Sequence, residues 1–255
     1  MATFTLAEIQ NTLPDPDNRI SYAGDTKSAN AGSALGPGYA SIQLSSEQKN
    51  LRDRTNSGRV LARSIAAHNW KISIKYNPMT QTQFDPIYAF LINRRGAVNP
   101  FFVQLPQYNA PRDSDFNTWS NASSSNRLVV DGSSAIAAGS SSVLVVKAGY
   151  SNTSNGTPRP GDLFTVNDSN NSNHLKAYMV TRVETSSDYQ TGTAQPGSTQ
   201  VRLHFTPGFS RSVSSVGQFT FTNPKIRVVL ANDVQQYSLN TNNLYEYSLS
   251  LEEAQ

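Results

Sequence analysis

The sequence predicts a mainly β protein with one helix, built as an antiparallel β-sandwich or barrel that carries an inserted small β-barrel domain. Charged residues make up only 15% of the 255-residue chain, and its polarity comes mostly from Ser, Asn, Thr and Gln. These residues suit turns and strand surfaces better than helices. Most apolar segments are short, alternate with polar residues, and are separated by clusters of Gly, Ser and Asn, which is typical of strands joined by turns.

A strand and the one predicted helix lie in the window 70–106. Over residues 70–76 every second residue is apolar, so one face of a strand can pack on a core. The period then changes, and the next apolar residues recur at the spacing of a helix that lies on a core. They are Phe84, Ile87, Tyr88, Leu91 and Ile92.

The ends of this helix are predicted from a proline and a glycine. Pro86 is comfortable only in a first turn, so the helix begins at about 83–85, or an earlier turn breaks there. Gly96 can adopt the left-handed conformation that closes many helices. A second short strand is expected over residues 101–105, between Pro100 and Pro106.

Residues 1–58 are predicted to form an extended N-terminal arm, because turn formers outnumber apolar residues there. Short strand pieces are expected at 4–6 and 42–44. Two interpretations stay open: a mobile tail, or an arm that orders only against a neighbouring subunit. The most basic window of the chain, residues 49–63, is interpreted as a solvated strand face.

Residues 109–223 have the character of an inserted β-barrel domain, because both borders resemble loops. Its expected strands are four to nine residues long, the rhythm of a small barrel or sandwich. They lie at 127–130, 143–147, 163–166, 176–184, 201–205 and 218–221.

The last part of the chain returns to longer strands, at 225–230, 234–239 and 244–251. The third alternates most regularly and is expected to complete the sheet that begins at Trp70. Residues 59–108 and 224–255 therefore form one discontinuous β domain, with the inserted barrel between them.

Composition excludes several classes of function. The net charge of +3 is too small to indicate nucleic-acid binding, which needs clustered cations, and the absence of cysteine removes disulfides and thiolate metal sites. No apolar run is long enough for a membrane span, and the N-terminus lacks the pattern of a signal peptide. A soluble protein that is not exported by a signal peptide is expected.

The sequence predicts no catalytic residue, no metal site and no cofactor. The three histidines, His68, His174 and His204, share no metal-ligand spacing, and neither a serine-nucleophile elbow nor a phosphate-binding glycine loop occurs. Aromatic residues in turns could instead stack on a sugar ring or pack on a partner. The stacking candidates are Trp119, Tyr150 and Tyr189.

The strand that begins at Trp70, the helix stripe, the turn at 94–96 and the Asn99-Pro100-Phe101 opening of the next strand resemble the core of tailed-bacteriophage tail proteins. The resemblance is greatest to distal tail and tube-to-baseplate adaptor proteins. Five later segments extend it over residues 59–255, as the inserted barrel and closing strands of such proteins: PGDLF, KAYMVTRV, VRLHFTPGF, TFTNPKIRVVL and LYEYSLSLEEAQ.

This resemblance implies a tail-tube-like fold and a non-enzymatic virion subunit, assembled in the host cytoplasm. Such a subunit forms a ring, commonly a hexamer, around a channel through which DNA passes. Its expected partners are further copies of itself, the tail tube, and baseplate hub or fibre proteins, without membrane insertion. Ring closure needs contacts between two different surfaces of neighbouring copies. The interface candidates are Arg94, Arg95, Gly96, Tyr22 and Tyr39.

Two alternatives belong to other classes. In the first, residues 109–223 form a carbohydrate- or receptor-binding module that uses the three stacking candidates. In the second, the chain hydrolyses cell-wall or capsule sugars, which requires two carboxylates at a defined separation. Asp162 and Asp188 are the acids to test for that reaction.

Overall fold

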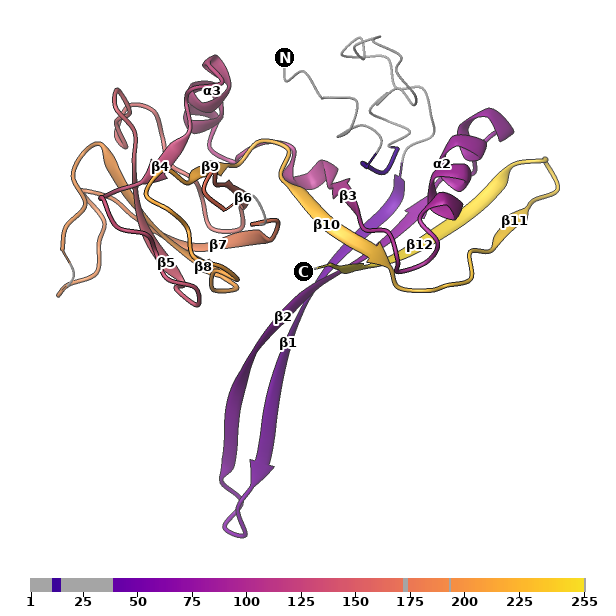
Figure 1. Ribbon diagram of the computed structural model, residues 1–255, viewed down its shortest axis with the longest axis horizontal. Coiled ribbons are helices and arrows are strands. Elements are labelled where there is room, and N and C mark those ends of the chain that lie inside the picture. The colour runs from indigo at the N-terminus through magenta and orange to yellow at the C-terminus, as the bar shows by residue number, and fades with distance from the viewer. Residues whose placement is uncertain (1–10, 15–38, 172–173, 193, 255) are drawn as a thin grey trace. The chain divides into compact units, whose positions relative to one another are not determined.

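The computed structural model describes residues 11–14, 39–171, 174–192 and 194–254 (Figure 1). The chain divides into two compact units, one formed by Met1–Val103 with Arg227–Ala254 and the other by Gln104–Ile226. The predicted strand at 4–6 and the candidate Tyr22 lie outside the described residues. The mainly β class predicted from the sequence is confirmed, with a six-stranded sheet in the first unit and a closed six-stranded barrel in the second.

The sheet of the first unit has the strand order β1-β2-β12-β10-β3, and a further strand, β11, pairs with β12. Its strands are β1 (Tyr39–Arg54), β2 (Val60–Tyr76), β3 (Phe101–Gln104), β10 (Lys225–Leu230), β11 (Tyr237–Leu239) and β12 (Tyr245–Glu253). The prediction that the C-terminal strand joins the one begun at Trp70 is confirmed, because β12 pairs antiparallel with β2 and aligns Leu249 with Ile74.

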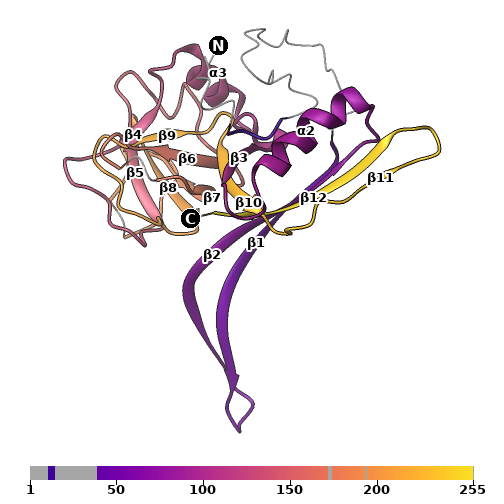
Figure 2. The ribbon, with the colours of Figure 1, turned by 45° about the vertical axis from the view of Figure 1, so that its right-hand side comes forward.

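Strand β1 is much longer than the short piece predicted at 42–44. It pairs antiparallel with β2 from Tyr39 opposite Tyr76 to Arg54 opposite Val60, with irregularities near Ala40 and Lys49. The two strands thus form one long hairpin (Figures 1 and 2). Most of β1 is exposed, so its sequence lacks the apolar alternation that would have revealed its length.

Helix α2 (Gln81–Asn93) begins before the predicted start at 83–85. The side-chain oxygen of Gln83 accepts a hydrogen bond from the backbone N–H of Thr80 at 3.0 Å, so a capping box fixes the first turn and Pro86 falls inside the helix. The predicted left-handed conformation of Gly96 is confirmed at φ 67°, and Arg95 before it also has a positive φ. Figure 2 shows α2 beside β11 and β12.

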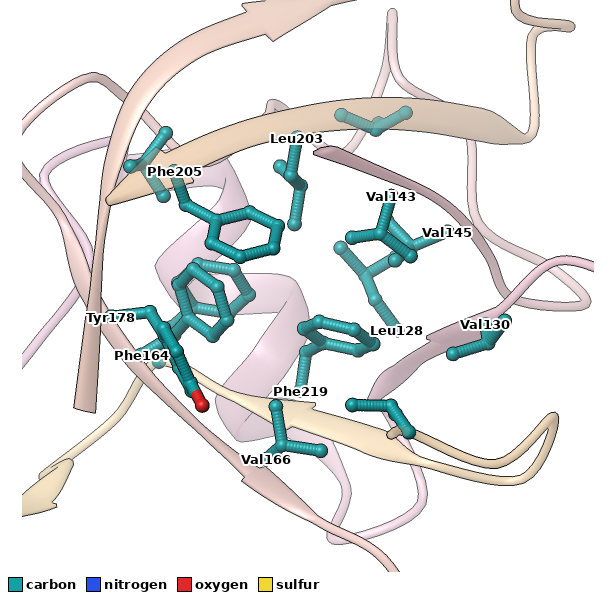
Figure 3. Close-up of a cluster of buried hydrophobic side chains, with 14 of the residues drawn as sticks. Leu128, Val130, Val143, Val145, Phe164, Val166, Tyr178, Leu203, Phe205 and Phe219 are labelled. Atoms are coloured by element: carbon teal, nitrogen blue, oxygen red, sulfur yellow. The ribbon is translucent and has the colours of Figure 1, made fainter. Parts of the chain in front are cut away.

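The second unit is a closed barrel with the strand order β4-β5-β8-β7-β6-β9. Its strands are β4 (Leu128–Val130), β5 (Ser142–Val146), β6 (Leu163–Asn167), β7 (Ala177–Glu184), β8 (Gln200–Thr206) and β9 (Gln218–Thr220). Alternate residues of these strands fill the interior with aromatic and branched side chains (Figure 3). Phe164, Phe205 and Phe219 are each at most 2% exposed. Closure leaves the barrel without unpaired sheet edges.

A second helix, α3 (Ser114–Ala122), lies where the sequence suggests only a loop, and a short 3₁₀ turn, η1 (Pro106–Tyr108), precedes it. Asp113 caps α3, because its carboxylate accepts hydrogen bonds from the backbone N–H groups of Asp115 and Phe116. The same carboxylate receives two hydrogen bonds from Arg159, at 3.1 and 2.6 Å. Phe116 is 1% exposed and belongs to the barrel core, so the helix is part of this unit.

Candidate assembly interface

The two faces of the β1–β2–β12 sheet differ sharply in chemistry. One face carries rows of apolar side chains, such as Ile42, Ile74 and Leu249, that continue across the three strands. The opposite face carries rows of small polar residues and a few charges. Those rows are Ser41–Lys75–Ser248, Gln43–Ser73–Ser250 and Ser45–Lys71–Glu252. The sheet therefore offers a broad polar face, defined here by these nine residues, to solvent or to a partner.

Ion pairs across strands neutralise part of this polar face. The ammonium of Lys71 lies 2.9 Å from Glu47 and 3.8 Å from Glu252. The hydrogen bond and charge of Glu47 raise the pKa of Lys71, and the same contact lowers the pKa of Glu47. All three side chains are well exposed, so these ion pairs neutralise charge on the polar face but contribute little to the stability of the fold.

The outer half of the β1–β2 hairpin, from Gln48 to Ser64, lacks cover from a third strand within the described part of the chain. Strand β12 pairs with β2 only over Lys71–Lys75, well before this half begins. Its apolar side chains are accordingly exposed: Leu51 at 60%, Val60 at 53% and Leu61 at 50%. Because an isolated two-stranded hairpin is marginally stable in water, this half has the properties of a segment that binds a partner.

The same outer half carries a local excess of positive charge. Five basic residues lie in it, opposed by Asp53 alone, and this excess is larger than the net charge of +3 of the entire chain. The five are Lys49, Arg52, Arg54, Arg59 and Arg63, all of them exposed. The sequence prediction of a solvated strand face agrees with this exposure.

A continuous series of aromatic rings joins α2 to the edge of the sheet. Phe84 stacks on Tyr245 with ring centroids 4.6 Å apart, and Tyr88 meets Tyr237 at 5.3 Å. Tyr237 is 48% exposed, and Leu239, two residues later on the same strand face, is 53% exposed. The helix-covered core thus reaches solvent along β11, leaving apolar surface at this edge.

The turn after α2 contains three of the interface candidates, in different environments. Arg94 is only 9% exposed, donates a hydrogen bond to Asn11 Oδ1 at 3.0 Å, and lies over the ring of Phe90. Its guanidinium is therefore occupied within its own subunit. Arg95 is exposed, and a Cβ at Gly96 would lie 2.7 Å from Asp233 Oδ1. Arg95 and the backbone around Gly96 remain predicted interface groups.

Tyr39 packs against Tyr76 at the start of the hairpin, with ring centroids 5.2 Å apart. It is half-buried and stands next to a hollow of about 580 Å³ that Ala40, Tyr76 and Tyr247 help to line. Its role in a subunit contact also stays a prediction.

The barrel does not bring the three stacking candidates to one surface. Tyr150 is 1% exposed, and its hydroxyl donates a 2.6 Å hydrogen bond to the carbonyl of Gly156. Burial raises the pKa of its phenol and leaves no ring face for a sugar, which corrects the assignment of this residue. Trp119 is half-buried and packs on Tyr150 at 4.8 Å. Tyr189 is 39% exposed, and stacking stays a prediction for these last two rings.

Residues 29–108 match the family model described as the N-terminal part of the A domain of the distal tail protein pb9. The resemblance to phage distal tail proteins is confirmed. The matched residues include β1, β2, α2 and β3, which carry the hairpin, one part of the polar face and the turn after α2. The match covers less than a third of the chain and indicates a structural protein of a phage tail. No curated protein matches the chain.

Outside the segment that matches distal tail proteins, the barrel contains a buried carboxylate that sequence reasoning missed. Glu184 is completely buried and lies 3.0 Å from Arg202, 3.2 Å from His204 and 3.5 Å from Arg182. Burial raises the pKa of this carboxyl, but the hydrogen bonds from Arg202 and His204 outweigh it and lower the pKa overall. A carboxylate held by several cations is typical of an ion-pair network that fixes neighbouring strands.

The two acids considered for hydrolysis occupy different settings. Asp162 is 3% exposed and accepts backbone hydrogen bonds from Arg112 and Arg159, so it holds a turn. Asp188 is exposed and closes the turn after β7, where its backbone N–H bonds to Thr185. Within the described residues, no group of three or more His, Asp or Glu side chains could hold a metal ion. No described helix combines the length and apolar character needed to cross a membrane.

Proposed function

We propose that this protein is a ring-forming structural subunit of the distal tail of a phage, a hexamer that connects the tail tube to baseplate or fibre proteins. The match of residues 29–108 to a distal tail protein carries this proposal. The exposed outer half of the hairpin supports it, because a subunit that works alone has no use for a long apolar and basic hairpin.

The polar face supports a role as the wall of a DNA channel. DNA that moves through a ring must not be held by clustered cations, since each phosphate contact adds to the affinity. On this face Lys71 is paired with carboxylates, and serine is the commonest residue of the three rows. A face of this kind offers weak, uniform contacts to a passing polyanion.

Each predicted domain has a separate role in the proposed function. Residues 59–108 and 224–255, together with β1 from the predicted arm, form the ring and its channel. The barrel, predicted at 109–223, is a closed unit that binds other tail proteins. No chemical step is part of this function, so the protein acts through its surfaces and not as an enzyme.

Ring formation is tested with a variant whose hairpin is shortened. Residues 49–67 are replaced by an Asn-Gly turn, so that Gln48 and His68, which are paired in the sheet, become the closing pair. The full-length chain should give rings with a central hole in negative-stain images and one oligomer by mass photometry. The shortened chain should stay monomeric at the same concentration, because it has lost the segment that binds its neighbour.

Thermal unfolding of the shortened chain is the control for folding. Its transition should stay close to that of the full-length chain, since the removed residues contact no third strand among those described. A monomeric full-length chain at tail-assembly concentrations would contradict the proposed function. If the shortened chain still forms rings, the proposed ring stands, but the outer hairpin is not part of the contacts between its subunits.

A further inference from the structure

Exposed apolar side chains gather on two separate surfaces of the first unit. Among the described residues, eight of the ten large apolar side chains that are exposed belong to this unit. Two form the hairpin patch, Leu51 and Leu61, while Val60 lies on the opposite face of the hairpin. Five form the helix–edge patch: Ile92, Val98, Val234, Tyr237 and Leu239. Such concentration on one unit indicates two binding surfaces rather than scattered apolar residues.

The hairpin patch lies on one face of the outer hairpin. Residues opposite each other in an antiparallel pair point to the same side, so Leu51 shares a face with Arg63, and Leu61 shares it with Asp53. The two leucines are diagonal neighbours on that face. An apolar centre bordered by a guanidinium and a carboxylate is the usual composition of a protein-binding surface.

The helix–edge patch is continuous across three segments. Tyr237 of β11 meets Tyr88 of α2, and Ile92 lies one helical turn beyond Tyr88. Asp233, the neighbour of Val234, contacts the turn after α2 at Gly96. The patch thus runs from Ile92 in the last turn of α2 through the Tyr88–Tyr237 contact to Leu239 on β11. Tyrosine-rich surfaces of this kind provide much contact area at little entropic cost.

The charges at the two patches are opposite. The outer half of the hairpin has five basic residues against one aspartate. At the helix–edge patch two exposed carboxylates, Asp85 and Asp233, outnumber the exposed Arg95, and no ion pair involves either carboxylate among the described residues. Complementary charge steers association and favours this pairing over contact between two basic hairpins.

We infer that the hairpin patch of one subunit binds the helix–edge patch of the next copy of this chain. The inference rests on the proposed ring, because a closed ring requires two different surfaces on every subunit. Leu51 and Leu61 then pack on Tyr237, Leu239 and Ile92, while arginines of the hairpin approach Asp85 and Asp233. The contact covers the outer hairpin, which pairs with no third strand among the described residues.

The pairing is tested by cysteine cross-linking, for which the chain is suited because it has no cysteine of its own. Leu61→Cys and Tyr237→Cys are prepared as separate variants, mixed under assembly conditions and treated with a short bismaleimide. The expected product joins Leu61→Cys of one copy to Tyr237→Cys of another and is identified by peptide mass spectrometry. The matched control replaces Tyr237→Cys by Val216→Cys, an exposed position of the barrel.

The outcomes separate this inference from the proposed function. Rings that form while the Leu61–Tyr237 product stays at the level of the Val216 control would overturn the pairing and leave the ring proposal standing. A product that joins two hairpins through Leu61→Cys would also overturn it, in favour of a symmetric contact. If the unmodified chain forms no ring, both the pairing of the two patches and the proposed function are contradicted.

Substitutions on either patch should weaken assembly to a similar degree. Leu61→Ser and Tyr237→Ser each remove apolar area from the contact, and each is expected to raise the assembly midpoint concentration about tenfold. Val216→Ser, equally exposed, should leave it unchanged. All three variants should unfold at nearly the same temperature as the parent chain, because the replaced side chains are about half exposed. A change in assembly from Val216→Ser, or none from Tyr237→Ser, would contradict the pairing.

Discussion

Gly156→Ala is expected to destabilise the barrel unit by about 3 kcal/mol, the sum of a strained backbone and a disturbed helix cap. Gly156 has φ 65°, where an L side chain is unfavourable. A Cβ at this position would overlap Asp113 Oδ1 and come within 2.8 Å of the backbone nitrogen of Phe116. The clash lies at the cap of α3, so the methyl group can be accommodated only by moving the carboxylate that holds the helix and Arg159.

Gly149→Ala is the matched control for this substitution. Gly149 also has a positive φ, 78°, but no atom lies within 4 Å of the position of its Cβ. It should cost about 1 kcal/mol, from backbone conformation alone. Urea unfolding followed by fluorine NMR of fluorotryptophan-labelled protein can measure both variants, because Trp70 reports on the sheet unit and Trp119 on the barrel. Equal shifts of the Trp119 transition in the two variants would contradict the clash.

Regular alternation made the main sheet predictable from the sequence. Residues 70–76 of β2 and the residues of β12 repeat with period two and bury one face each, so these strands and their pairing could be inferred. The barrel strands were predictable for the same reason, aided by the turn residues between them. In each case the burial of one strand face requires an apolar residue at every second position, and this alternation is visible in the sequence.

The long hairpin could not be predicted, because its outer half packs against no third strand in the part of the chain that the structure describes. Residues 49–63 show neither alternation nor a core-facing set, and their large apolar side chains are exposed among the described residues. An exposed strand pair of this kind leaves no periodic pattern in the sequence. The sequence did place the charge correctly, as the most basic window of the chain.

Two buried polar groups of the barrel were missed for local reasons. The pairing of β7 with β8 has an irregularity between Val180 and Arg182, after which Val183 faces Leu203 in the core and Glu184 lies on the opposite face beside Arg202 and His204. Tyr150 follows a glycine and precedes a serine, so it resembles an exposed turn residue. Helix α3 could have been predicted from the sequence, because Asp113 stands three residues before Phe116, the spacing of a helix-capping residue.

The stability of the barrel is expected to fall by about 2 kcal/mol between pH 7 and pH 5 because of His174. Burial, only partly opposed by the carboxylate of Asp168, lowers the pKa of His174 from 6.5 to about 4. The unfolded chain therefore binds a proton at a pH where the folded barrel does not. The stability that depends on neutral His174 is fully present above pH 6.5 and is lost as the pH falls toward 4. This is the direction expected for a histidine that is buried in its neutral form.

The structure explains why the neutral ring is favoured. His174 is 3% exposed, and its Nε2 lies 2.7 Å from the hydroxyl of Tyr178, which also contacts Ser210. Phe209 meets the ring edge-on, so a charge would face an apolar wall and lose its hydration. His174→Gln can still hydrogen bond to the hydroxyl but cannot titrate.

The variant is compared with the parent chain by urea unfolding at several pH values between 5 and 7.5, with Trp119 as the reporter. The free energy of unfolding of the parent should decline with falling pH, while that of His174→Gln should stay nearly level. The carboxylates of Asp113, Asp168 and Glu184 have lowered pKa values, so the stability that they contribute is lost only at more acidic pH. Parallel slopes for the parent and the variant would show that the pH dependence arises elsewhere, whereas a slope confined to the parent assigns it to this buried imidazole.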